Sequence, residues 1–302
     1  MAGGLCGEVA SMAITISRRD LLHAGYGTAA ALGVSAVAGE LAPVPAVAQT
    51  SSNDPKEDLF YREDWFGEPW RKPEPAMLIH GNDESSIVWY AWVPGMGQQF
   101  RTLRPDLPGF GRSKVPAGFE WSLPSLATFV AHVLDKAGID SAHIVGAKTG
   151  GAIAMQFAAD YPARTRTLSV ASGPASVIQI ANPSPIPQRD RLGSAASKEM
   201  VDYWNTTFAT APEEGTKGLH TALSKFDLAR DGVLQRIKAP TLVMTADRSA
   251  LQSVEKVRQY QLLIPKSRLV VLHSDAYHIA AANAEECVAN VLAFIKETRQ
   301  NG

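Results

Sequence analysis

The fold of this chain is decided by one stretch, Val145-Gly146-Ala147-Lys148-Thr149-Gly150-Gly151-Ala152. Its first two residues end a short apolar run, residues 142–146. Its last residues open a segment in which apolar residues recur at helical spacing. Gly146 and Gly150 carry no side chain where a strand and the following helix nearly touch, so the backbone can make a strained turn there. The sequence therefore predicts a strand, a sharp turn with Lys148 at its apex, and a helix.

Working outward from this stretch, segments typical of strands alternate with segments typical of helices. Apolar runs predict further strands at 76–80, 100–105, 165–171, 241–245 and 268–273. Helical spacing predicts helices at 125–137, 150–161, 251–264 and 280–296, and aromatic residues around Gly67 predict an opening hairpin over 58–70. This alternation predicts βαβ units and therefore an α/β fold, with a mostly parallel sheet covered by helices on both faces.

The alternation breaks between Gly173 and Pro240, where a proline-rich stretch is followed by helical segments at 197–208 and 219–230. We expect an insertion over about 174–238 that forms a helical cap above the carboxyl edge of the sheet. Trp204 and its aromatic neighbours in the cap would then line a substrate pocket. The alternative is that these aromatic side chains only pack the cap onto the core.

The first 48 residues have the features of an export signal. Ser17-Arg18-Arg19-Asp20-Leu21-Leu22 resembles the twin-arginine motif, an uncharged stretch follows over 24–39, and Ala46-Val47-Ala48 is a small-x-small cleavage site. We expect a Tat signal peptide over 1–48, a linker over 49–56, a main domain over 57–302, and a periplasmic or secreted protein. The alternative is an uncleaved amphipathic or membrane-anchoring helix. Cleavage would leave Cys287 as the lone cysteine, so no internal disulfide is expected.

The composition is that of an ordinary globular protein, with 45% hydrophobic and 20% charged residues among 302. The 29 Lys and Arg almost balance the 30 Asp and Glu, so charge gives no reason to expect nucleic acid or an anionic membrane surface as a partner. No glycine-rich loop matches a nucleotide-binding pattern, and no Cys/His spacing suggests zinc. We therefore expect a small-molecule substrate, no cofactor and no metal, and the oligomeric state stays open.

Three landmarks in a fixed order resemble the cap-bearing branch of the α/β-hydrolase superfamily, over about residues 57–298. The turn matches the nucleophile elbow, G-x-Nuc-x-G, of that family. His80-Gly81 resembles its loop after a buried strand, and residues 104–113 resemble its structural PD-x-x-G-x-G-x-S segment. The resemblance implies that the backbone amides of Asn82 and Thr149 form an oxyanion hole. It also implies that His278 is the catalytic histidine.

The chain departs from this family pattern at two positions. Lys148 stands where the family's hydrolases usually have serine, and Ser249 stands at the usual position of the acid, with Asp247 two residues earlier. We take Asp247 as the candidate catalytic acid. The alternatives are that Asp275 serves, or that His278 has no acid partner, so the serine triad cannot simply be transferred.

The loop after His80-Gly81 carries three polar residues, Asn82, Asp83 and Glu84, near the expected mouth of the site. One of them could orient a substrate or pair with Lys148, while a solvated loop is the alternative. We take Asp83, together with Trp204 of the cap, as candidate substrate-binding residues.

A lysine at the apex of the turn would be desolvated and would lie at the positive end of a helix. Both effects disfavour the ammonium form, so we expect the pKa of Lys148 to fall. A neutral amine can attack a carbonyl carbon to form a Schiff base, or act as a base, with His278 moving protons. We therefore expect a hydrolase-superfamily enzyme acting on a small carbonyl or ester compound. The alternatives are a Schiff-base lyase or decarboxylase, and a non-catalytic ligand-binding pseudoenzyme.

Overall fold

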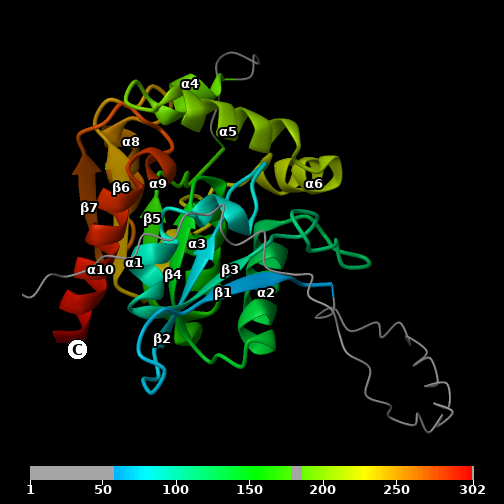
Figure 1. The fold of residues 1–302 in the computed structure, drawn as a ribbon, viewed down its shortest axis with the longest axis vertical. Coiled ribbons are helices and arrows are strands. Elements are labelled where there is room, and N and C mark those ends of the chain that lie inside the picture. Colours follow the sequence, from blue (N-terminus) through cyan, green and yellow to red (C-terminus); the bar gives the residue numbers. More distant parts are fainter. Residues whose placement is uncertain (1–57, 178–185, 301–302) are drawn as a thin grey trace, which may run out of the picture. The chain divides into compact units, whose positions relative to one another are not determined.

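The computed structural model describes residues 58–177 and 186–300 (Figure 1). All of them belong to the unit Ser51–Gly302. The expected signal peptide and linker lie outside the described residues. Within the described part of the chain, no helix combines the length and apolar character needed to cross a membrane.

A seven-stranded sheet forms the centre of the molecule, in the order β1-β3-β2-β4-β5-β6-β7. Only the edge strand β1 is antiparallel to its neighbour, and the five other pairings are parallel. The prediction of a mostly parallel α/β sheet is therefore confirmed. The strands span Tyr61–Asp64 (β1), Glu74–Ile79 (β2), Phe100–Pro105 (β3), Ala142–Ala147 (β4), Thr165–Ala171 (β5), Thr241–Ala246 (β6) and Ser267–Leu272 (β7).

The predicted opening hairpin over 58–70 is wrong. The strand in that segment, β1, pairs with β3 some forty residues further along the chain, with Tyr61 opposite Pro105. Aromatic residues around a glycine indicate strand character, but the partner of such a strand is set by the packing of the whole sheet. Here β1 extends the sheet and covers the outer edge of β3.

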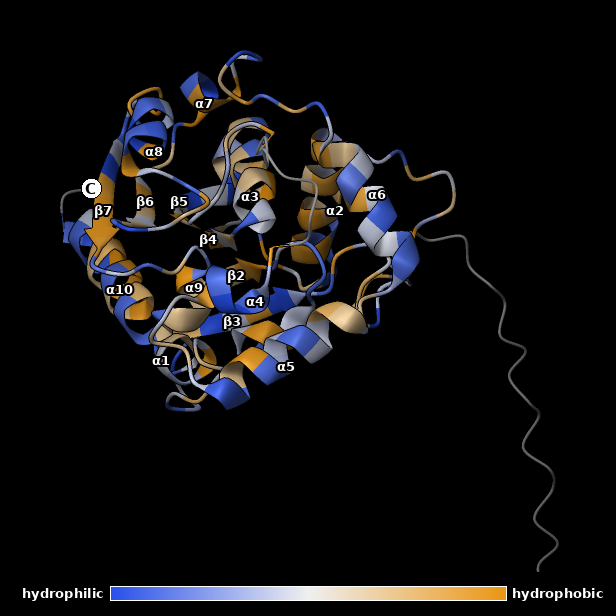
Figure 2. Ribbon diagram, turned by 90° about the horizontal axis from the view of Figure 1, so that it is seen from above, coloured by the Kyte–Doolittle hydropathy of each residue, from blue (hydrophilic) through white to orange (hydrophobic). Residues whose placement is uncertain are grey.

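Helices cover both faces of the sheet, as predicted, and each face has its own apolar cluster. Figure 2 shows α2, α3 and α8 on one face and α1 and α10 on the other. The helices of the first face span Leu123–Lys136 (α2), Thr149–Asp160 (α3) and Val254–Gln261 (α8). Those of the second span Val93–Gly97 (α1), Ile279–Ala282 (α9) and Ala284–Gln300 (α10), while 3-10 turns span Ser86–Trp89 (η1) and Pro162–Arg164 (η2).

The turn between β4 and α3 has the strained backbone that the sequence predicts. Lys148 lies at its apex with φ 51° and ψ −128°, a conformation that residues other than glycine adopt at a cost. A Cβ atom on Gly146 would lie 2.4 Å from the carbonyl oxygen of Gly150, and one on Gly150 would lie 2.3 Å from that of His80. The two glycines are therefore required for the close approach of strand and helix.

Among the described residues between β5 and β6, four helices are present: Gln188–Leu192 (α4), Lys198–Ala209 (α5), Glu213–Leu223 (α6) and Val233–Arg236 (α7). Figure 1 shows α4, α5 and α6 above the carboxyl ends of the central strands. The helix predicted at 219–230 starts and ends earlier in the structure, at Glu213 and Leu223. Pro212 directly precedes its first turn. Trp204 of α5 is fully buried, and its neighbours Met200, Val201 and Phe208 are partly buried against the same apolar cluster.

Candidate active site

The amine of Lys148 is enclosed by protein. The residue is only 3% exposed, and Nζ donates a short hydrogen bond to Oε1 of Glu84. The ring centroid of Phe208 lies 4.7 Å from Nζ and that of Trp204 lies 6.0 Å away. The turn at the end of β4 therefore directs the amine under α5 of the helical insertion and onto a buried carboxylate.

Glu84 connects the amine to the imidazole. One carboxylate oxygen, Oε2, accepts a hydrogen bond of 2.8 Å from the backbone N–H of Gly81. The other oxygen, Oε1, contacts Lys148 and also lies 3.7 Å from Nε2 of His278. The side chain of Glu84 is 1% exposed. Amine, carboxylate and imidazole thus form one cluster inside the protein.

His278 is held by two helices of the insertion. Its backbone N–H donates to the carbonyl oxygen of Arg191 in α4 over 2.8 Å. The ring of Trp204 in α5 packs edge to face on its imidazole, with the centroids 4.5 Å apart. The insertion therefore fixes the position of the imidazole and excludes water from it.

The cluster shifts the acid–base equilibria of all three groups. Burial, reinforced by the charge of Lys148, lowers the pKa of His278 from 6.5 to about 3, so the imidazole is neutral around pH 7. Burial also lowers the pKa of Lys148, against the opposing effect of Glu84. Burial works against ionisation of Glu84, but Lys148 and the hydrogen bonds to its carboxylate outweigh it and lower its pKa.

The two expected oxyanion-hole residues lie side by side. The backbone N–H of Asn82 donates to Oγ1 of Thr149 over 2.7 Å, and Thr149 is the first residue of α3. The side chain of Asn82 donates to Asp83 and lies 2.8 Å from Nε2 of His220. The structure brings the two residues together but gives the Asn82 amide an internal acceptor, and their oxyanion role stays a prediction.

The loop that carries these residues is fixed by His80. Nε2 of this buried imidazole accepts from the backbone N–H of Leu107, so Nδ1 donates to the carbonyl oxygen of Gly81. Asp83 adopts φ 61° and accepts from the hydroxyl of Thr216 in α6 over 2.8 Å. Asp83 therefore ties the loop to the insertion, and its contact with a substrate stays a prediction, as does that of Trp204.

Asp247, the candidate acid partner of His278, contacts other groups in the structure, and its catalytic role stays a prediction. β6 ends at Ala246, and the following turn places Asp247 against the segment after β7, where its carboxylate contacts His273 Nδ1 at 2.6 Å and accepts from the Ser274 amide. Asp275 accepts from the backbone N–H of Ser194. The carboxylate that the structure places against His278 is that of Glu84.

Among the described residues, no group of three or more His, Cys, Asp or Glu side chains is arranged to hold a metal ion. Cys287 is buried, and burial raises the pKa of its thiol, so the thiol stays protonated.

Comparison with known proteins agrees with this architecture. The family model described as "alpha/beta hydrolase fold" matches residues 74–192. The chain is 38% identical to a pimeloyl-[acyl-carrier protein] methyl ester esterase of Aeromonas hydrophila over 32% of this chain and 37% of the relative. It is 32% identical to a 2-hydroxy-6-oxo-2,4-heptadienoate hydrolase of Pseudomonas putida over 31% of this chain and 35% of the relative. These alignments span only about a third of the relatives' length.

Among solved structures, the chain is similar to the enol-lactonase from Burkholderia xenovorans LB400. The TM-score is 0.68 at 21% identity, and the match covers 79% of this chain and 96% of that one. The chain therefore has the α/β-hydrolase fold.

Proposed function

We propose that this protein is an α/β-hydrolase-superfamily enzyme that acts on a small carbonyl or ester compound, with the amine of Lys148 in place of the usual serine. One observation carries the proposal. The Lys148 amine and the His278 imidazole meet at a single carboxylate oxygen of Glu84, and all three side chains are buried. Perturbed titratable groups of this kind gather at functional sites.

The buried pair supplies a route to a reactive amine. The ion pair is the resting form, because Lys148 lowers the pKa of Glu84. Burial lowers the pKa of Lys148, and transfer of one proton from its Nζ to Oε1 of Glu84, which replaces two buried charges by two neutral groups, releases the amine for attack. The neutral amine then adds to a carbonyl carbon, and the carbonyl oxygen receives a proton to give a carbinolamine. Loss of water yields an imine, and neutral His278 accepts or returns a proton during these steps.

An amine nucleophile favours carbonyl compounds over simple esters, because an acyl-lysine would be a stable amide. An imine withdraws electrons from the neighbouring carbon–carbon bond, so C–C cleavage or decarboxylation is the reaction type that this chemistry serves best. The relatives named as an esterase, an oxo-acid hydrolase and an enol-lactonase support a substrate with a carbonyl or ester group.

Reductive trapping tests the proposal. The protein is incubated with a panel of small aldehydes and ketones and with borohydride, and the adduct is located by peptide mass spectrometry. We expect a mass increase equal to the ligand less one oxygen atom, on Lys148. Lys148→Arg should abolish the adduct, whereas Lys296→Arg, which changes an exposed lysine of α10, should leave it intact. Reaction spread over surface lysines, with Lys148 unmodified, would refute the amine mechanism.

A second function, ligand binding without turnover, is favoured by the Asn82 amide. Because this amide already donates to Thr149, an oxyanion would have to displace an internal hydrogen bond. Saturable binding of carbonyl ligands without adduct or turnover would support this reading. Turnover of the carbonyl panel that is lost in Lys148→Arg would exclude it.

We also propose export through the Tat route with cleavage after Ala48, on the basis of the twin-arginine motif and the small-x-small site. Replacement of Arg18 and Arg19 by lysine should keep the protein in the cytoplasm. N-terminal sequencing of the exported wild type should begin at Gln49. Export of the lysine variant at the wild-type level would contradict the proposed route.

A further inference from the structure

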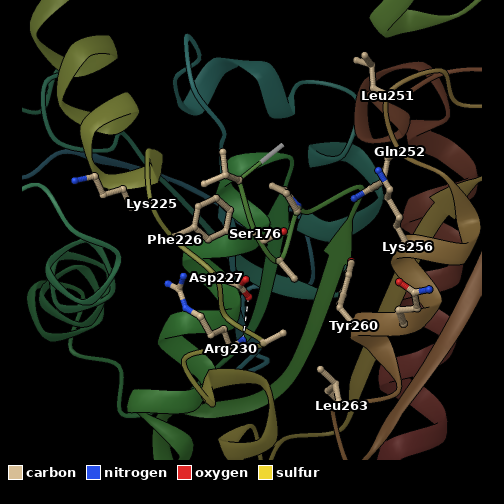
Figure 3. Close-up of a pocket in the computed structure, with 15 residues that line it drawn as sticks. Ser176, Lys225, Phe226, Asp227, Arg230, Leu251, Gln252, Lys256, Tyr260 and Leu263 are labelled. Atoms are coloured by element: carbon tan, nitrogen blue, oxygen red, sulfur yellow. Dashed lines mark hydrogen bonds between the residues drawn. The ribbon is translucent and has the colours of Figure 1, made fainter. Parts of the chain in front are cut away.

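A cavity of about 930 Å³ lies between the segment that follows β5 and helix α8 (Figure 3). Residues 174–177 line one side, and Gln252, Lys256 and Tyr260 line another. Tyr260 belongs to the apolar cluster of the α3 and α8 face, whereas Trp204, beside His278, belongs to the cluster of the opposite face. None of the three groups of the Lys148 cluster lines this cavity.

The polar floor of the cavity contains a buried acceptor without a donor. The carbonyl oxygen of Gly173 accepts from the hydroxyl of Tyr260 at 2.9 Å and from Nε2 of Gln252 at 3.3 Å. This contact fixes the orientation of the Gln252 amide, because only its nitrogen can donate to a carbonyl. Gln252 is 8% exposed, and its Oε1 has no hydrogen-bond partner within the described residues. A buried polar atom of this kind requires an explanation, and a ligand donor supplies one.

The rim of the cavity has an excess of positive charge. Asp227 accepts from the backbone N–H of Arg230, and the guanidinium of Arg230 pairs with Asp231. Lys225 and Lys256 stand on opposite sides of the cavity in Figure 3. Neither lysine has an acidic partner within the part of the chain that the structure describes. An anionic group on a ligand would therefore be attracted to this rim.

The remaining walls are apolar and partly open to solvent. Phe226, Leu251 and Leu263 line the cavity together with Val177, and Val177 and Leu263 are 36% and 37% exposed. Ligand sites in proteins typically combine such walls with a few polar groups, in a volume of roughly 300–1,000 Å³.

We propose that this cavity binds an aliphatic carboxylate that has an N–H or O–H donor close to its charged end. The donor bonds to Oε1 of Gln252, the carboxylate lies near Lys256 or Lys225, and the chain packs against Phe226 and Leu263. The site is distinct from the Lys148 cluster and does not depend on the reaction proposed there.

Isothermal titration calorimetry with the purified protein tests this site. The probe is N-octanoylglycine, whose amide N–H lies beside its carboxylate, and the matched probe is N-octanoylsarcosine, which has an N-methyl group instead. We expect one equivalent of N-octanoylglycine to bind, and at least about fivefold weaker binding of the methylated probe, because a hydrogen bond is lost. Gln252→Leu should remove the difference between the two probes.

Charge is tested separately, at exposed residues. Lys225→Glu/Lys256→Glu should weaken binding at least about tenfold, whereas Lys296→Glu, at an exposed position outside the cavity, should have no effect. Lys148→Arg should bind the probe as the wild type does. Absence of saturable binding, equal affinity for octylammonium, or equal effects of the Lys225/Lys256 and Lys296 changes would overturn the proposal.

Discussion

Two clusters, each containing a glutamate and basic residues, lie at opposite ends of β2 and β4, and they differ in exposure. At the amino ends, Glu74 contacts His143, Arg166 and Arg299. At the carboxyl ends, Glu84 contacts Lys148 and His278. The Glu74 side chain is 39% exposed and that of Glu84 is 1% exposed.

This difference in exposure separates a solvated cluster from a desolvated one. Water and two arginines stabilise the Glu74 carboxylate, so its ion pairs act as ordinary surface contacts between strands and α10. The Glu84 carboxylate has no such solvent, and the stability of its charge depends on one amine and one backbone amide. The two clusters therefore differ in how strongly the charge of the glutamate depends on its protein partners.

The largest expected effect is on chemistry. Lys148→Met should abolish adduct formation and lower turnover by at least about 10³-fold, because the attacking group is removed. His143→Gln, at the opposite ends of the same strands, should leave both within about twofold of wild type. Comparable losses in the two variants would mean that the clusters do not differ in function.

The next effect is on stability. Lys148→Met leaves Glu84 buried without a cation and should lower the free energy of unfolding by about 3–5 kcal/mol. Lys148→Met/Glu84→Gln should recover most of this loss, because no charge is then left in the core. Urea unfolding monitored by circular dichroism measures both values. A double variant as unstable as the single one would contradict the picture of an unpaired buried charge.

Stability should also fall on acidification, with a contribution from each buried histidine. Burial lowers the pKa of His143 to about 4 in the folded protein, whereas the unfolded chain takes up the proton near 6.5. Stability is therefore lost as pH falls from about 6.5 towards 4, by about 3 kcal/mol for His143. His278 acts in the same sense down to about pH 3. His143→Gln should flatten the dependence of Tm on pH above pH 4, and an unchanged slope would contradict this origin.

The smallest effect is expected at Glu74. Glu74→Gln removes one partner from each of three contacts, but the group is well solvated, so unfolding should be easier by no more than about 1 kcal/mol. This loss of unfolding free energy should be smaller still in about 0.5 M salt, because screening weakens exposed ion pairs. A salt-independent loss above about 2 kcal/mol would show that this cluster is effectively buried too.

The fold was predictable wherever local pattern determines structure. Residues 100–105 and 165–171 form strands with the predicted bounds, and the glycines around Lys148 predicted the turn. The partner of β1 and the true span of α6 were not predictable, because each depends on contacts with distant segments. One such contact is that of Gly218 in α6 with Trp121, where the indole occupies the space of a Cβ atom.

The site was predictable in part for the same reason. Motif order pointed to Lys148 and His278, and the structure brings both to one carboxylate. The sequence predicted Glu84 only as one of three loop residues that could pair with Lys148, because Asn82-Asp83-Glu84 is equally compatible with a solvent-exposed loop. Its burial depends on the loop conformation fixed by His80 and on the insertion above it, which the sequence does not show. Asp247 lies closer than Glu84 to the family's usual acid position along the chain, but in the structure its carboxylate contacts His273.

The corner at residue 148 owes its shape to the neighbouring glycines and not to the residue at its tip. A different side chain at the tip would meet the same backbone, the same α3 amino terminus and the same imidazole. The backbone at this corner can therefore accept other side chains, because the contacts of Gly146 and Gly150 do not involve the residue at the tip. The ion pair with Glu84 is the contact that depends on the lysine itself, so replacing the tip residue changes the charge balance of the core and leaves the shape of the turn as it is.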